Sequence, residues 1–331
     1  MTRRDLLGAM ALGGAALLAG CATDMDVPLA PEAVGPGPEQ RRVWTFSDSH
    51  VGANIKHTAG REAADWMRLC LADVRENLQP VDFAVPLGDI TDLGQEDQVA
   101  QYVTLRRASG IATWFEVAGN HDFAALPAGH WQTLVGRPAR YVVFDGNTVW
   151  VLVSSMQGRS VGWLSRSVVG WMQRTIAAHQ DKNVIVCTHQ PPYNTVAGST
   201  GKETYLSLAG PGKESTPEEG RMIARMLEQV RVDLWLCGHI HAGRRSRGYI
   251  ARRGATTFIN VAALGRMYNT GACTSYVLEM QAGQKQLQCR CRNHETRQFV
   301  EGQDVTVELP VAARFSARPE MRVAGLPTRH V

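Results

Sequence analysis

Aspartate, asparagine and histidine residues recur in short clusters that lie far apart along this chain. The clusters read Asp48-Ser49-His50, Gly88-Asp89, Gly119-Asn120-His121-Asp122, His189 and Gly238-His239-Ile240-His241. Carboxylate oxygens, an amide oxygen and neutral imidazoles suit borderline-hard divalent ions such as Mn, Fe or Zn, and the set contains no thiolate. These residue types therefore indicate a metal site, provided that the fold brings them together.

Each cluster follows a short apolar run of the kind that forms a β-strand. The runs occupy residues 43–46, 83–85, 114–117, 184–187 and 234–237. Side chains at the carboxyl ends of strands in an open sheet meet in one crevice. A single cluster is weak evidence, because Gly-Asp pairs and lone histidines are common in proteins without metals. The ordered set is stronger, and it predicts that the ligands converge.

Asp89 is the candidate for a ligand that two cations share. Cations held about 3.5–4 Å apart repel one another, and a carboxylate between them can give one oxygen to each. A pair bound in this way lowers the pKa of a water molecule to about 7 and binds a phosphoryl group for in-line attack. The residues therefore indicate hydrolysis of a phosphoester.

The order D-x-H, GD, GNHD, H and GHxH resembles that of the calcineurin-like metallophosphoesterase superfamily, over roughly residues 42–261. The resemblance implies a phosphodiesterase or phosphatase with two divalent metal ions (Mn, Fe or Zn), in which a metal-bound hydroxide attacks phosphorus. It implies the following ligands: Asp48, His50 and His241 for one metal, Asn120, His189 and His239 for the other, and Asp89 as the bridge.

The resemblance also implies two catalytic residues that do not bind metal. His121 would protonate the leaving group, and Asp92, at the end of the run Gly88-Asp89-Ile90-Thr91-Asp92, would pair with it. A carboxylate behind an imidazole fixes its tautomer and raises its pKa, as a general acid requires. The alternative for Asp92 is a solvated residue at a helix start.

Subfamily differences narrow the resemblance. Purple acid phosphatases have an iron-binding tyrosine at the position of Asp92, so this chain does not fit that subgroup. Phosphoprotein phosphatases have arginine where Leu93 stands and glutamate where Asp122 stands. The bacterial phosphodiesterase and phosphatase branch fits without conflict. The residues do not choose between monoesters and diesters.

Alternating strands and helices, followed by strands alone, predict the fold. Apolar residues at helical spacing predict helices over residues 60–78, 95–109 and 167–179, and a capping box at Thr216 predicts a helix that runs to about Val230. Asp145-Gly146-Asn147 predicts a hairpin, and residues 249–292 read as successive strands. We expect an α/β fold, a four-layer α/β/β/α sandwich of two mixed sheets flanked by helices, as the resemblance also implies.

The amino terminus has the pattern of an export signal. Arg3-Arg4 is a twin-arginine signature before an apolar stretch, and Leu18-Ala19-Gly20-Cys21 resembles a lipobox. We expect the twin-arginine machinery to export the protein across the cytoplasmic membrane, with a lipid on Cys21 anchoring it towards the periplasm or the cell exterior. Cleavage without lipidation is the alternative. The predicted organisation is residues 1–21 signal peptide, 22–40 Pro/Gly-rich tether, 41–293 metallophosphoesterase domain and 294–331 a loosely packed extension with one strand at 305–309.

Composition limits the partners. The formal net charge is +4, with 44% hydrophobic and 20% charged residues, which is ordinary for a globular protein and makes no strong case for nucleic acid. Other possibilities stay open: a nuclease or a lipid-linked diphosphate hydrolase on the same site, or a non-catalytic surface lipoprotein. The basic run 244–247 is either a solvated face or attracts a phosphate-bearing substrate.

The remaining candidates are less specific. A Gly-, Ser- and Thr-rich loop after His189 is expected to overhang the site, with Tyr193 or Asn194 contacting the substrate or the loop acting only as a lid. We expect surface positions for the histidines outside the clusters, namely His57, His179, His294 and His330. An oxidising compartment permits disulfides, but the sequence does not choose the pairs.

Overall fold

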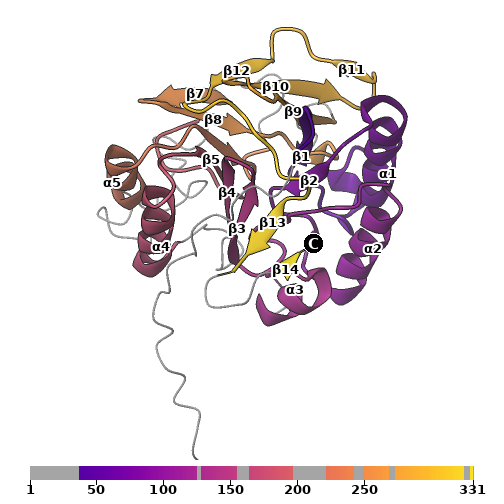
Figure 1. The fold of residues 1–331 in the computed structure, drawn as a ribbon. Helices are drawn as coiled ribbons and strands as arrows, with labels where there is room; N and C mark the ends of the chain where they lie inside the picture. Colours follow the sequence, from indigo (N-terminus) through magenta and orange to yellow (C-terminus); the bar gives the residue numbers. More distant parts are fainter. Residues whose placement is uncertain are drawn as a thin grey trace, which may run out of the picture.

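Two β-sheets pack face to face, with helices on both outer faces (Figure 1). The computed structural model describes residues 37–124, 128–154, 164–196, 221–241, 249–267, 273–323 and 329–330. Helices α1 (Ala63–Asp73) and α2 (Glu96–Arg107) lie outside one sheet, and α4 (Arg166–Ala177) and α5 (Met222–Gln229) lie outside the other (Figure 1). This architecture confirms the predicted four-layer α/β sandwich of two mixed sheets.

The first sheet has six strands in the order β11-β10-β9-β1-β2, with β12 also pairing with β10. Strands β1 and β2 are parallel, whereas β9 and β10 run antiparallel to their neighbours. The strand bounds are Gln40–Phe46 (β1), Phe83–Pro86 (β2), Thr274–Gln281 (β9), Gln286–Asn293 (β10), Gln298–Phe299 (β11) and Val305–Glu308 (β12).

The second sheet has eight strands in the order β14-β13-β3-β4-β5-β6-β8-β7. Its central strands β4, β5, β6 and β8 are parallel, and the strands towards both edges are antiparallel. The bounds are Arg140–Asp145 (β3), Thr148–Val153 (β4), Asn183–Thr188 (β5), Leu234–Cys237 (β6), Ile250–Arg253 (β7), Thr256–Asn260 (β8), Glu320–Arg322 (β13) and Arg329–His330 (β14). The predicted hairpin joins β3 to β4.

Apolar side chains fill three interfaces between the layers. Residues such as Phe83, Ile185 and Leu278 pack between the two sheets, while Trp44 and Trp235 pack beneath the outer helices. The helices are Ala63–Asp73 (α1), continued by a π-helical turn over Val74–Leu78, then Glu96–Arg107 (α2), Ala128–Val135 (α3), Arg166–Ala177 (α4) and Met222–Gln229 (α5), with a 3-10 turn at Ile55–His57. The predicted helices are thus confirmed to within a few residues, although the predicted start of the helix at Thr216 lies outside the described residues.

The segment that follows β10 is packed, and the expectation of a loose extension was wrong. The strand predicted at 305–309 is β12, which pairs with β10, and β13 pairs with β3 in the other sheet. Ala313, Phe315 and Met321 are buried in the core between the sheets. These short strands complete sheet edges, so their apolar residues lack the periodicity that reveals a longer element.

Two further expectations need correction. Residues 114–117 do not form a regular strand: Trp114 and Val117 make only isolated bridges, to Ala84 and Leu87. His179 and His294 are buried rather than exposed, whereas His57 is exposed as expected. The side chain of His330 lies outside the described part of the chain.

The described residues include six of the seven cysteines of the chain. Within this part of the chain, the six cysteines are buried, and the Sγ atoms of Cys70 and Cys273 lie 3.1 Å apart. Among the described residues, no helix has the length and apolarity that crossing a bilayer requires. The predicted signal peptide, Cys21 and most of the tether fall outside the described residues and stay predictions.

Candidate metal centre

Six of the seven candidate ligands lie just beyond the carboxyl ends of four strands, and Asn120 lies after the isolated bridge at Val117. Asp48 and His50 follow β1, and Asp89 follows β2 in the same sheet. His189 follows β5, and His239 and His241 follow β6 in the other sheet. Because the two sheets pack face to face, these turns meet at one end of the sandwich.

The backbone at these turns is unusual. The φ angles of five candidate ligands are positive: Asp48 53°, His50 41°, Asp89 47°, His239 71° and His241 45°. A non-glycine residue in this region costs about 1–3 kcal/mol, and such residues gather at functional sites. At Gly119, a Cβ atom would lie only 2.3 Å from Oδ1 of Asp89, so only glycine allows this approach. The fold therefore accepts strain to bring the ligands together.

The first group of ligand atoms comes from Asp48, His50, Asp89 and His241, which lie within 4.8 Å of one another. Nε2 of His241 is 3.1 Å from Oδ1 of Asp48 and 3.3 Å from Nε2 of His50. Nε2 of His50 is 3.8 Å from Oδ2 of Asp89. These are the residues predicted for the first metal, together with the predicted bridge.

The second group consists of Asp89, His189 and His239, again within 4.8 Å of one another. Nε2 of His189 is 3.1 Å from Oδ2 of Asp89 and 3.2 Å from Nδ1 of His239. Nδ1 of His189 bonds to the carbonyl of Leu87 at 2.7 Å, which orients the ring. Asp89 belongs to both groups, as a bridging ligand must.

The donor set fits divalent cations. Oδ1 of Asp48 and Nε2 of His239 are buried and make no hydrogen bond within the described part of the chain. Leaving a buried polar atom unsatisfied costs about 1–3 kcal/mol. Nε2 of His50 and Nε2 of His241 also face one another at 3.3 Å, so the lone pairs of two neutral rings could both be used by one cation. A cation would satisfy these atoms. We call the residues of the two groups the metal cluster.

Charges within the metal cluster shift the pKa values of its members. Burial raises the pKa of Asp48, but the neighbouring His241 and His189 outweigh it and lower the pKa to about 2. Burial lowers the pKa of His189, but the charge and hydrogen bond of Asp89 raise it to about 9. Burial, reinforced by His189, lowers the pKa of His239 to about 3. The carboxylates are thus ionised and His239 is neutral, as ligands must be.

Comparison with known proteins decides the family. Calcineurin-like phosphoesterase is the family whose sequence pattern matches, over residues 41–243. The chain belongs to this family. Membership supports a metal-dependent phosphoesterase, and the metal cluster provides residues that could hold the metal. No curated protein matches this chain.

Solved structures show the same calcineurin-like fold. Purple acid phosphatase PPD1 from yellow lupin (Lupinus luteus) aligns with a TM-score of 0.57 and 14% identity over 84% of this chain and 55% of the lupin chain. The protein GAP50 of Plasmodium, described as the anchor in the inner membrane complex, aligns with a TM-score of 0.54 and 11% identity over 85% of this chain and 92% of its own. At this identity the likeness concerns the fold alone.

The calcineurin-like core also places His121 and Asp92 beside the metal cluster. Nδ1 of His121 lies 2.6 Å from the backbone carbonyl of Asp92. The carboxylate of Asp92 is nearer to His50, with Oδ1 at 3.4 Å from Nδ1, than to Nδ1 of His121 at 3.8 Å. The main-chain oxygen of Asp92 therefore holds the His121 ring, and its carboxylate faces both imidazoles.

Asp122 is a site residue whose role the sequence did not reveal. Its buried carboxylate accepts hydrogen bonds from the backbone N–H groups of Gly119, Ile90 and Thr91 at 2.8, 3.2 and 2.8 Å, and from the Thr91 hydroxyl at 2.8 Å. Burial raises its pKa to about 6, although these hydrogen bonds act against the rise. Asp122 therefore joins the turn that carries Asp89 to the turn that carries Asn120. The signal was its place directly after His121 in the GNHD motif.

The loop after His189 is described only in its first part. Asn194 is exposed and Tyr193 is partly exposed, and the side chain of Arg253 donates to the carbonyls of Asn194 and Thr195 at 3.4 Å. Residues 197–220 and the basic run 244–247 lie outside the described residues. Contact of Tyr193 or Asn194 with a substrate stays a prediction.

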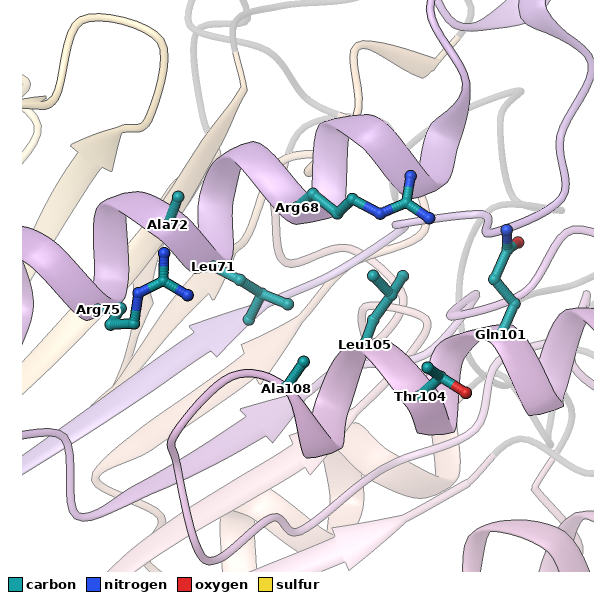
Figure 2. Close-up of a pocket in the computed structure, with 8 residues that line it drawn as sticks. All are labelled: Arg68, Leu71, Ala72, Arg75, Gln101, Thr104, Leu105 and Ala108. Carbon is teal, nitrogen blue, oxygen red and sulfur yellow. The ribbon is translucent and has the colours of Figure 1, made fainter.

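A cavity of about 450 Å³ lies between α1 and α2, and not at the metal cluster (Figure 2). Its lining includes two arginines, and no residue of the metal cluster belongs to it. The lining residues are Arg68, Leu71, Ala72, Arg75, Gln101, Thr104, Leu105 and Ala108. We therefore assign the chemistry to the strand ends rather than to this cavity.

Proposed function

We propose that this protein is an exported phosphoester hydrolase that binds two divalent cations, Mn, Fe or Zn. The observation that carries the proposal is the membership of Asp89 in both ligand groups. A single carboxylate between two sets of imidazoles is the arrangement that lets two cations lie about 3.5–4 Å apart.

Each residue of the centre has a part in this proposal. One cation would be held by Asp48, His50 and His241, the other by Asn120, His189 and His239, with Asp89 shared. When bound, such a pair lowers the pKa of a water molecule and neutralises charge on a phosphoryl group. The protein supplies the orientation, because the backbone and Asp122 fix the turns on which these ligands stand.

His121 is the proposed general acid. Its Nδ1 is held by the carbonyl of Asp92, so the proton on Nδ1 is committed to that hydrogen bond. In the doubly protonated ring, Nε2 is then the nitrogen that can give a proton to the leaving oxygen, while Nδ1 keeps its own. The side chain is 25% exposed, in contrast to the fully buried His50 and His189, so a substrate can reach it. The proposed catalytic partner of His121 is Asp92.

His121→Ala tests this function. We expect the variant to keep its cations and to lose about 10²–10⁴-fold in turnover, the usual contribution of a general acid. The assay compares a chromogenic phosphate monoester with the corresponding bis-ester in Mn, Fe and Zn. His57→Ala, which changes an exposed histidine outside the cluster, is the control. Unchanged turnover in His121→Ala would remove the general-acid role.

The alternatives predict other outcomes of the same assay. If the wild-type protein binds cations but hydrolyses neither chromogenic ester, a specialised substrate such as nucleic acid or a lipid-linked diphosphate is favoured. If it binds no cations, a non-catalytic role is favoured; the Plasmodium protein described as an anchor has this fold. The complete ligand set supports the hydrolase.

Export and anchoring rest on the sequence of the amino terminus. We propose that Arg3-Arg4 directs the chain to the twin-arginine machinery and that Cys21 carries the lipid. Cys21→Ala is expected to move the protein from the membrane fraction to the soluble fraction, while activity per molecule is unchanged. Fractionation of cells that produce either form is the measurement, and continued membrane attachment of Cys21→Ala would exclude a lipid on this residue.

A further inference from the structure

A buried amide lies directly beside the metal cluster and has no role in the function proposed so far. Gln190 follows the ligand His189 and is fully buried. Its backbone is fixed, because the Thr188 hydroxyl donates to its carbonyl at 2.8 Å and in turn accepts from Nε1 of Trp235 at 2.8 Å. The side chain of Gln190 therefore starts from an anchored main chain.

The Gln190 amide contacts one of the candidate ligands. Its Nε2 donates to Oδ1 of Asn120 at 2.9 Å. An asparagine amide has two ends, and only its oxygen can bind a cation, since the NH₂ group has no free lone pair. Because the Nε2 group of Gln190 is a donor, the end of the Asn120 amide that faces it must be the oxygen. The oxygen has two lone pairs, so it can accept from Gln190 and keep the other for a cation.

We propose that Gln190 is a positioning residue that selects the metal-binding orientation of Asn120. This proposal rests on the two-cation function above and assigns a residue to the cation that His189 and His239 would bind. In metalloproteins, a partner that orients a ligand in this way typically changes metal affinity by about 10–100-fold.

The other end of this amide is an acceptor. Oε1 of Gln190 is buried and has no hydrogen-bond partner within the described residues. Buried atoms without partners occur both in the metal cluster, at Oδ1 of Asp48 and Nε2 of His239, and outside it, for example at Nε1 of Trp150. The amide of Gln190 therefore contacts Asn120 through its Nε2 end, and the placement of Gln190 rests on that hydrogen bond.

The test measures stepwise binding of Mn²⁺ to Gln190→Met by titration calorimetry. Methionine has a similar length but no donor, so we expect the first cation to bind as in the wild type and the second to bind about 10–100-fold more weakly. Gln190→Glu, which keeps the shape but cannot donate when ionised, is expected to show the same loss. Thermal unfolding in chelator shows whether the fold is intact.

The matched control is Gln180→Met, which changes a partly buried glutamine that bonds to the carbonyls of Ile176 and Arg231, away from the cluster. It should bind both cations like the wild type. If both cations bind normally to Gln190→Met, or if both weaken together, the positioning role is wrong. If the wild type itself never binds a second cation, the two-cation function fails as well, so the two failures are distinguishable.

Discussion

Two buried groups of aspartate and histidine lie in this protein, and they differ in how completely their polar atoms are paired. One is the metal cluster. The other, which we call the Asp73 cluster, lies where α1 meets the first sheet. Its members are Asp73, Arg292, His294, Ser275 and Trp44. Within the described residues, none of their buried side-chain nitrogens or oxygens lacks a hydrogen bond, whereas atoms of Asp48 and His239 do.

The hydrogen bonds of the Asp73 cluster form one continuous chain. The carboxylate of Asp73 accepts from Nε and Nη2 of Arg292 at 2.9 and 2.7 Å and contacts Nδ1 of His294 at 2.8 Å. Nε2 of His294 is 2.7 Å from the hydroxyl of Ser275, which accepts from Nε1 of Trp44 at 2.8 Å. No member has a positive φ, in contrast to five residues of the metal cluster.

The difference separates a group that stabilises the fold from a group that could bind a cation. Burying an ion pair is tolerated when every lone pair and proton is used, and the Asp73 cluster meets that condition. The metal cluster combines backbone strain with unsatisfied atoms, both of which cost free energy unless a cation is bound. A cation that satisfies those atoms would offset the cost. Buried Asp and His residues alone are therefore not evidence of a metal site; unsatisfied, strained ones are.

The largest expected effect comes from changing the shared carboxylate. Asp89→Asn removes the negative charge that would lie between two cations, so we expect loss of metal and loss of hydrolysis together. Elemental analysis of the purified variant and the ester assay are the measurements. Full metal content in Asp89→Asn would show that position 89 is not the bridge and would remove the main contrast between the two clusters.

Asp73→Asn should lower the stability of the fold and leave cation binding unchanged. The change leaves Arg292 buried without its carboxylate, which costs about 3–5 kcal/mol of folding free energy. For a domain of this size, the midpoint of thermal unfolding should fall by roughly 10 °C. The folded variant should still bind cations with wild-type stoichiometry. A loss of bound metal without a loss of stability would contradict the structural role of this cluster.

The smallest expected effect is the pH dependence of cation binding. Burial lowers the pKa of His189, but Asp89 raises it to about 9, so the metal-free protein holds a proton on His189 at neutral pH. A cation must displace this proton, and affinity should rise about tenfold per pH unit from pH 7 to 9 and level off above. The same proton stabilises the metal-free fold below pH about 6.5, and that contribution is lost as the pH rises through 9. Titration calorimetry of chelator-treated protein measures the cation affinity, and scanning calorimetry measures the stability of the fold. A cation affinity that does not change between pH 7 and 9 would show that binding displaces no proton from His189.

The ligand clusters can be proposed from the sequence because each depends on local order. A strand of β-branched and aromatic residues followed by Gly-Asp or Gly-His is visible in a short window, as at β2 and Asp89. Asp122, Gln190 and His294 could not be assigned in this way, since their partners are 31, 70 and 221 positions away. The packing of β13 was missed for the same reason: three residues carry no periodic pattern, and the pairing with β3 depends on the rest of the sheet.

Anomalous diffraction from crystals grown with Mn²⁺ tests the central claim most directly. We expect two peaks about 3.5–4 Å apart, one on each side of the Asp89 carboxylate. We also expect no peak at Asp73 and His294, whose donors are already paired. A single peak, or peaks that do not contact Asp89, would contradict the assignment of a shared carboxylate between two cations.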